Sequence, residues 1–200
     1  MKKARKSFSL TMILAIMLLA CLLMCSLGAT GAWFSATGGK INFTLNVSGA
    51  DIYVYQGNVK LDSTKQQYIT LEQEIQPDVE VPLVLTLKSN EPSGNYVRFK
   101  FQVFAIGQTN TEITVDKNIS SPTSSTNGFT RIDEENENDF YYYANSSTEL
   151  QKFTDDQKIG LVLISGFTIK SDDFAQLNGD TIKIVLTVEC SDVNWNTQSN

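Results

Sequence analysis

Carboxylates are the side chains most able to do chemistry in this chain, because its 200 residues include no histidine. That absence removes a Ser-His-Asp triad, a Cys-His pair and the usual zinc sites. Carboxylate oxygens bind calcium, and one acidic run supplies several of them: Asp133, Glu134, Glu135, Glu137 and Asp139. The run lacks the glycine that an EF-hand loop needs at its sixth position. The sequence therefore leaves two interpretations, a weak cation loop and a solvated acidic loop.

Other catalytic groupings are weak. The adjacent acids Asp155-Asp156 and Asp172-Asp173 could in principle serve a glycosidase, but such pairs in polar loops are commonly solvated surface. Gly38-Gly39 precedes a strand pattern and does not open a helix, so it is no phosphate loop. We expect no enzymatic activity, no cofactor and no resident metal.

Four aromatic residues could bind a ligand instead. Aromatic rings stack on sugars and peptides, and the candidates are Tyr55, Tyr141, Tyr143 and Trp195. The competing interpretation is that each ring packs within a sheet.

The first 32 residues have the pattern of a secretory signal. Residues 10–27 are almost continuously apolar, small residues follow, and a basic stretch precedes them: Lys2, Lys3, Arg5 and Lys6. We expect cleavage between Ala32 and Trp33, which divides the chain into a signal peptide (1–32) and one domain (33–200). Two alternatives are an uncleaved membrane anchor and a lipobox ending at Cys21.

Charge and cysteine content limit the partners. Residues 33–200 hold 12 basic and 22 acidic residues, a formal charge of −10. That charge argues against nucleic acid and anionic membrane as partners, so we expect membrane contact only through an uncleaved signal. Cys190 is the only cysteine after the signal, so it can form no internal disulfide. We expect it to be a small buried residue on a strand, with pairing between chains as the alternative.

The domain has strand patterns almost throughout. Residues 41–47 alternate apolar and polar, and residues 96–104 place Val97, Phe99, Phe101 and Val103 on one face, which should be core. Further strands are expected at 51–55, 68–71, 81–87, 112–115, 159–169 and 181–189, with a long polar excursion over 107–128 and one helical turn at 171–177. The fold class is therefore all-β, an antiparallel two-sheet sandwich or jelly roll.

Several short motifs together resemble one known family. Gly28–Ser35 resembles the signals cut by the SipW-type signal peptidase, and Tyr96–Lys100 is similar to a tyrosine–valine–arginine strand of the TasA/camelysin family of Gram-positive biofilm matrix proteins. The other matching pieces are Gln76-Pro77-Asp78 before Val81-Pro82-Leu83, Phe140–Tyr143, and the closing strand Lys183–Cys190.

The resemblance implies a secreted jelly-roll subunit of an extracellular matrix or surface fibre. Its partners would be further copies or a related matrix protein, after the signal peptidase has acted. Assembly would occur by donation of a strand within residues 33–47, through Trp33, Phe34, Ile41, Phe43, Leu45 and Val47. The alternative for 39–47 is the first strand of its own subunit. The alternative function is a secreted binding module for polysaccharide or a surface protein.

Overall fold

The computed structural model describes residues 40–49, 51–90, 93–107, 110–131, 139–146, 149–154, 160–174, 177 and 181–195. All of them lie in the second of the two compact units into which the chain divides, 36–200. In chain order the elements are β1 (Lys40–Ser48), β2 (Ile52–Gln56), β3 (Val59–Lys60), β4 (Gln67–Thr70), β5 (Glu80–Ser89), β6 (Asn95–Ile106), β7 (Asn110–Ile113), β8 (Val115–Asn118), β9 (Gly128–Thr130), β10 (Tyr141–Ala144), β11 (Lys152–Phe153), β12 (Leu161–Ile169), α2 (Ser171–Phe174) and β13 (Thr181–Ser191).

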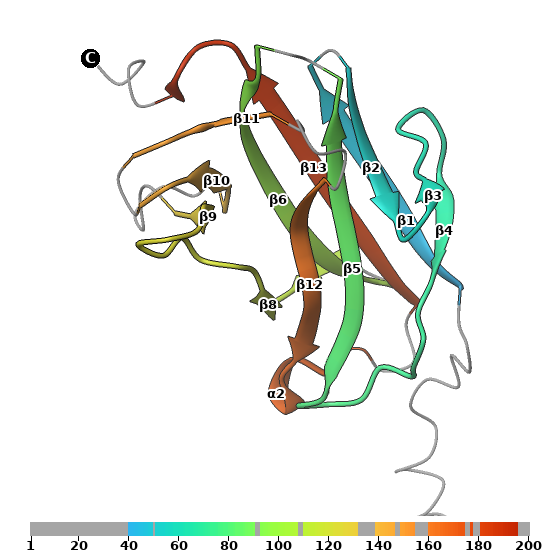
Figure 1. Ribbon diagram of the computed structural model, residues 1–200. Coiled ribbons are helices and arrows are strands. Elements are labelled where there is room, and N and C mark those ends of the chain that lie inside the picture. The colour runs from blue at the N-terminus through green and yellow to red at the C-terminus, as the bar shows by residue number, and fades with distance from the viewer. Residues whose placement is uncertain are drawn as a thin grey trace, which may run out of the picture. The chain divides into compact units, whose positions relative to one another are not determined.

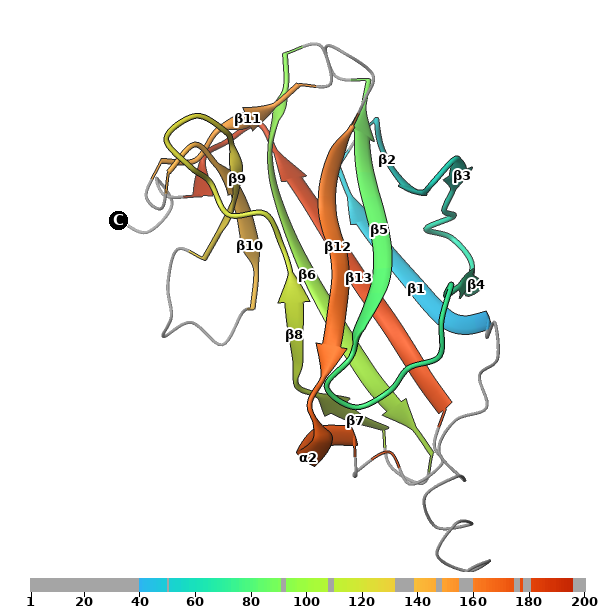
Figure 2. The same ribbon diagram turned by 60° about the horizontal axis from the view of Figure 1, so that its bottom comes forward.

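These strands form two packed sheets, as expected for a β-sandwich. The first has the order β4-β1-β13-β6-β10-β9, with β7 and β11 also paired to β6; the second has the order β3-β2-β5-β12-β8. Strands β5 and β12 cross in front of β6 and β13 in both ribbon views (Figures 1 and 2). Along the described strands the chain changes sheet at eight places: β1–β2, β3–β4, β4–β5, β5–β6, β7–β8, β8–β9, β11–β12 and β12–β13.

One pairing departs from the antiparallel expectation. β1 runs parallel to β13, whereas every other strand pair in the described residues is antiparallel. The register joins Asn42 to Lys183 and Ser48 to Glu189. A short hairpin would impose an antiparallel direction, but β1 and β13 lie at opposite ends of the chain and no hairpin connects them.

The core lies between the two sheets. Predicted inward residues of β6 are buried as expected: Val97, Phe99, Phe101 and Val103 are at most 2% exposed. Phe101 meets Phe167 of β12 across the interlayer space, with ring centroids 5.6 Å apart. Alternation along β6 thus supplies one wall of the core and leaves its other face toward solvent.

Part of the polar segment 107–128, which was expected to be a surface excursion, forms paired strands. β7 pairs with the end of β6 in the first sheet, and β8 pairs with β12 in the second. The predicted strand at 112–115 is therefore two short strands that separate at Thr114. The expected helical turn is α2, which buries Phe174.

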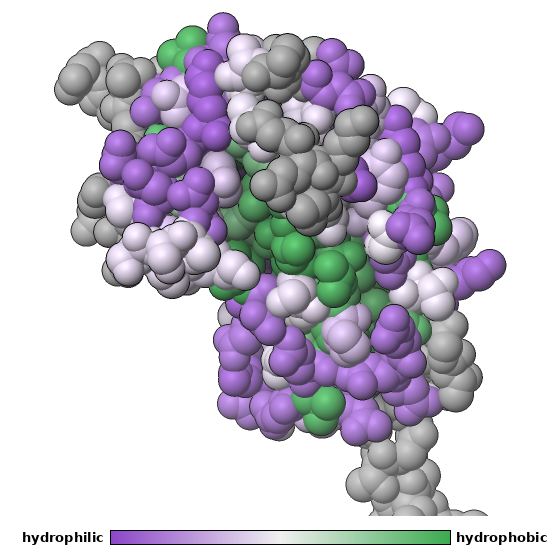
Figure 3. All heavy atoms as spheres, in the orientation of Figure 1, coloured by the Kyte–Doolittle hydropathy of each residue, from purple (hydrophilic) through white to green (hydrophobic). Residues whose placement is uncertain are grey.

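Much of the face shown in Figure 3 is hydrophilic, with apolar atoms gathered over β5 and β12. Those two strands carry the exposed Val84 and Val162. Among the described residues, no helix combines the length and apolar composition needed to cross a membrane.

Candidate functional site

The predicted donor strand, β1, occupies a groove between β13 and β4. β13 pairs with it over Asn42–Ser48, and β4 pairs antiparallel with Lys40–Phe43 on the other side. Both partners follow β1 in sequence, so the groove is formed by the rest of the domain.

Three side chains of β1 point into the core. Ile41, Phe43 and Leu45 are 5%, 0% and 2% exposed, and Val47 is half-buried. The alternation of these residues with Asn42, Thr44 and Asn46 follows from the period-two geometry of a strand. Residues 40–48 therefore form the first strand of their own subunit in this structure.

The outward face of β1 makes polar contacts with both neighbouring segments. Asn46 Nδ2 donates to Thr187 Oγ1 of β13 at 3.4 Å, and Gln66 Nε2 donates to Asn42 Oδ1 at 3.2 Å. These hydrogen bonds are exposed to solvent, so each contributes little to the free energy of unfolding. Their main effect is to favour the observed alignment of β1 with its neighbours.

The second half of β1 borders an open cavity. β4 ends its pairing at Phe43, and among the described residues no strand pairs with Thr44–Ser48 on that side. A cavity of about 410 Å³ lies there, lined by Leu45, Val47, Ile52, Tyr53, Val54, Lys60, Leu61, Asp62 and Ser63. The cavity separates the edge of β1 from β2 of the other sheet.

A tight turn joins β1 to the rest of the domain. Gly49 has φ of 122° and Asp51 has φ of 56°, both in the left-handed region. A Cβ on Gly49 would lie 3.0 Å from Cβ of Cys190. The turn therefore packs closely against β13, and glycine suits both its conformation and its space.

Part of the predicted assembly segment lies outside the described residues, namely Ala32, Trp33 and Phe34. The same holds for four members of the acidic run, Asp133, Glu134, Glu135 and Glu137. Asp139 is described, and its carboxylate accepts a hydrogen bond from Arg131 Nη2 at 2.8 Å. Within the described part of the chain, no three His, Cys, Asp or Glu side chains gather closely enough to hold a metal ion.

The four candidate aromatic residues all contact neighbouring side chains. Tyr141 stacks on Phe99 with centroids 5.5 Å apart, and Tyr143 meets Phe153 edge-on at 5.9 Å. Trp195 meets Tyr142 at 5.8 Å, while Lys88 Nζ lies 5.2 Å from the centroid of Tyr55. Each ring is half-buried, so each combines packing with some exposed surface.

Sequence reasoning did not identify the cluster around Arg98. Its guanidinium lies 4.4 Å from the ring centroid of Phe140 and 4.8 Å from that of Trp195, and Nε donates to Glu189 Oε2 at 2.7 Å. Burial alone would lower the pKa of Arg98, but hydrogen bonds to Glu189 and Tyr142 raise it overall. The predicted alternation of β6 placed Arg98 on the outer face, but no sequence spacing indicated the partners that lie there.

Cys190 is a free, half-buried thiol on β13. Burial, with a smaller contribution from Glu189, raises the pKa of Cys190 to about 12. The thiol is therefore protonated and unreactive at neutral pH, as for a packing residue.

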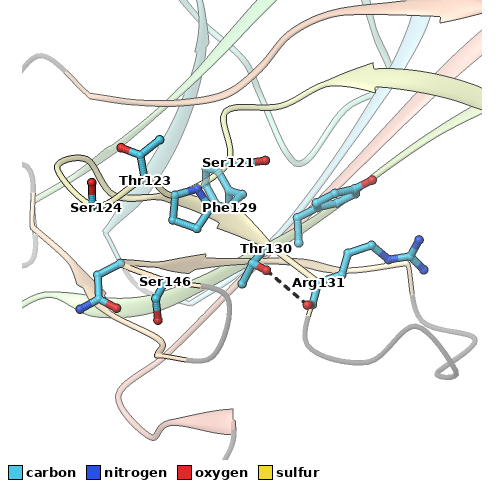
Figure 4. Close-up of a pocket in the computed structure, with 10 residues that line it drawn as sticks. Ser121, Thr123, Ser124, Phe129, Thr130, Arg131 and Ser146 are labelled. Carbon is cyan, nitrogen blue, oxygen red and sulfur yellow. Dashed lines mark hydrogen bonds between the residues drawn. The ribbon is translucent and has the colours of Figure 1, made fainter.

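Another cavity lies beside β9 and β10, far along the first sheet from β1. Its volume is about 590 Å³, and it is lined by Ser121, Pro122, Thr123, Ser124, Phe129, Thr130, Arg131, Tyr141, Asn145 and Ser146 (Figure 4). Three separate segments contribute these residues, which is why no local motif predicted the cavity.

Comparison with known proteins identifies no relative: no family model matches the chain, and neither a curated protein nor a solved structure matches it.

Proposed function

We propose that this protein is a secreted, non-enzymatic subunit of an extracellular biofilm matrix or surface fibre, of jelly-roll type, which assembles by donating its first strand to another copy. The proposal rests on the signal pattern of residues 1–32 and on the resemblance to the TasA/camelysin family described above. The observation that carries it is the seating of β1, an N-terminal strand held in a groove made by β4 and β13.

Donation of β1 would expose a groove that another β1 fits. Removing the strand would uncover one edge of β13 and the core space now filled by Ile41, Phe43 and Leu45. Backbone hydrogen bonds along that edge would give affinity, and the three inward side chains would fix the register.

Exchange of β1 between copies would leave the net free energy of burial almost unchanged. Each buried side chain of this size contributes about 1.5–3 kcal/mol, and a strand from a second copy would restore the same contacts. Trp33 and Phe34 precede β1 and would extend the donated segment with further apolar surface. Figure 3 shows apolar atoms gathered over β5 and β12, and these two strands also carry the exposed Val84 and Val162. Exposed apolar surface is a second feature typical of a self-associating protein.

A disulfide across β1 and β13 tests the proposal. Asn46 and Thr187 are directly paired and their side chains share the outer face, so Asn46→Cys with Thr187→Cys should form a disulfide. The background carries Cys190→Ala to remove the competing thiol. The control is Lys100→Cys with Thr187→Cys, which joins β6 to β13 without involving β1.

Two orders of oxidation give opposite expected results. Oxidation of monomer should lock β1 in its own subunit and abolish the fibres seen by electron microscopy, whereas the control pair should still assemble. Oxidation after assembly should give a ladder of covalent multimers on a non-reducing gel. Fibres formed by locked monomer, monomers only after late oxidation, or no fibres from the unmodified protein would each refute strand donation.

A further inference from the structure

The cavity beside β9 and β10 has walls fixed by the backbone. Phe129 N donates to the carbonyl of Ser120 at 2.8 Å, which ties the segment before the cavity to β9. A Cβ on Gly128 would lie 2.4–2.5 Å from backbone atoms of Ser120, Ser121 and Pro122, so the two segments are in direct contact. The cavity is therefore formed before any ligand arrives, which reduces the cost of ordering on binding.

The loop that forms one wall is also held internally. Thr123 N donates to the carbonyl of Thr126 at 2.8 Å, and the hydroxyls of the same two residues lie 2.6 Å apart. Hydroxyl groups on this loop and across the cavity are the commonest polar lining groups: Ser121, Thr123, Ser124, Thr130 and Ser146 (Figure 4). Hydroxyls both donate and accept, which suits a ligand that carries hydroxyls of its own.

One amide oxygen in the lining has no hydrogen-bond partner among the described residues. Asn145 Nδ2 donates to Glu149 Oε2 at 3.0 Å, which fixes the orientation of the amide. Asn145 Oδ1 is buried and accepts no hydrogen bond from any residue that the structure describes. A buried acceptor in this state is costly. Asn145 Oδ1 has no surface open to solvent, so the lining hydroxyls, and not this oxygen, would meet a ligand.

Apolar groups complete the lining. Phe129, Tyr141 and Pro122 contribute carbon surface, and Tyr141 is held in place by its stacking on Phe99. Among the described lining residues Arg131 is the one that is charged, and Asp139 accepts its hydrogen bond at 2.8 Å, so the described lining carries little net charge. Rings beside neutral donors and acceptors match a sugar, which has apolar C–H faces and a hydroxyl rim.

We propose that this cavity binds a neutral saccharide unit of a polysaccharide. Its volume of about 590 Å³ is within the range of ligand sites. None of its lining residues belongs to β1, β4 or β13, so the site does not depend on strand donation.

Titration of the full-length protein with oligosaccharides tests the site. The probes are cellopentaose, isomaltopentaose and chitopentaose as neutral chains, and trigalacturonic acid as an acidic one, with binding measured by calorimetry. Thr130→Val keeps the side-chain shape and removes a lining hydroxyl, which in the ligand-free protein donates to the carbonyl of Arg131 at 3.3 Å. Asn145→Ala removes the lining amide. Thr168→Val on β12 is the matched control, because it makes the same change on a strand that does not line the cavity.

We expect at least one neutral probe to bind with a dissociation constant in the millimolar range or below. Thr130→Val and Asn145→Ala should each weaken that binding at least fivefold, while Thr168→Val should leave it unchanged. Two-dimensional NMR spectra of each variant would establish that the fold is retained. Absence of binding by all neutral probes, preference for the acidic probe, or binding unaffected by Thr130→Val in a folded protein would overturn the proposal.

Discussion

Replacement of Phe43 by alanine measures how firmly β1 is held in its groove. The Phe43 side chain has no exposed area and lies at the centre of β1, paired with Ile184 on one side and Gln67 on the other. Truncation of a fully buried phenylalanine costs about 3–5 kcal/mol through lost burial and a residual cavity. That loss is a large part of the roughly 5–15 kcal/mol by which a typical domain is stable.

Urea unfolding of dilute, monomeric protein, followed by circular dichroism, gives the measurement. With a slope of roughly 2–3 kcal/mol per molar for a domain of this size, the midpoint of Phe43→Ala should fall by about 1–2.5 M. Thr44→Ala is the control, because Thr44 is the next residue and faces outward; its cost should stay below about 1 kcal/mol. Equal destabilisation by the two variants would show that β1 does not contribute its inward face to the core.

Two further predictions concern tight packing and the buried thiol. Gly128→Ala places a methyl group against the backbone of Ser121 and should cost about 1–3 kcal/mol in thermal unfolding; an unchanged melting temperature would contradict that contact. Cys190 should react with iodoacetamide at pH 8 far more slowly in native protein than in urea, and equal rates would contradict its burial. Folding raises the pKa of Cys190 to about 12 from an unfolded value of about 8.5. The protonated thiol therefore contributes to the free energy of unfolding fully below about pH 8.5, and this contribution is lost as pH rises toward 12. Cys190→Ala should remove this part of the pH dependence of stability.

Local alternation was sufficient to predict most strands. In β6 the spacing of Val97, Phe99, Phe101 and Val103 gave both the strand and its buried face, because burial on one side of a sheet imposes period two. The same rule gave β1 with its inward residues. These features depend only on neighbours in sequence, so a single chain is enough to derive them.

Pairings between distant segments were not derivable in the same way. Nothing in residues 41–47 specifies that β13 is their neighbour or that the two strands run parallel. The hydrogen bonds between strands are made by the backbone, so they do not depend on which side chains are present. The cavity beside β9 shows the same limit, since Ser121, Thr130 and Asn145 meet only after three segments have packed. The Arg98 cluster likewise requires Trp195, almost a hundred residues later.

The pairing of β1 with β13 also determines the order in which the first sheet can fold. The contact between Asn46 and Thr187 joins residues 141 positions apart, so β1 can pair with β13 only after nearly the whole domain is present. Contacts of such long separation form slowly, and chains that wait for them expose apolar surface to one another. Until the last strand emerges, Ile41, Phe43 and Leu45 have no completed groove to enter. Under the proposed strand donation, a strand from another copy would compete with the strand of the same chain for that groove, so the outcome would depend on protein concentration while the sheet is incomplete.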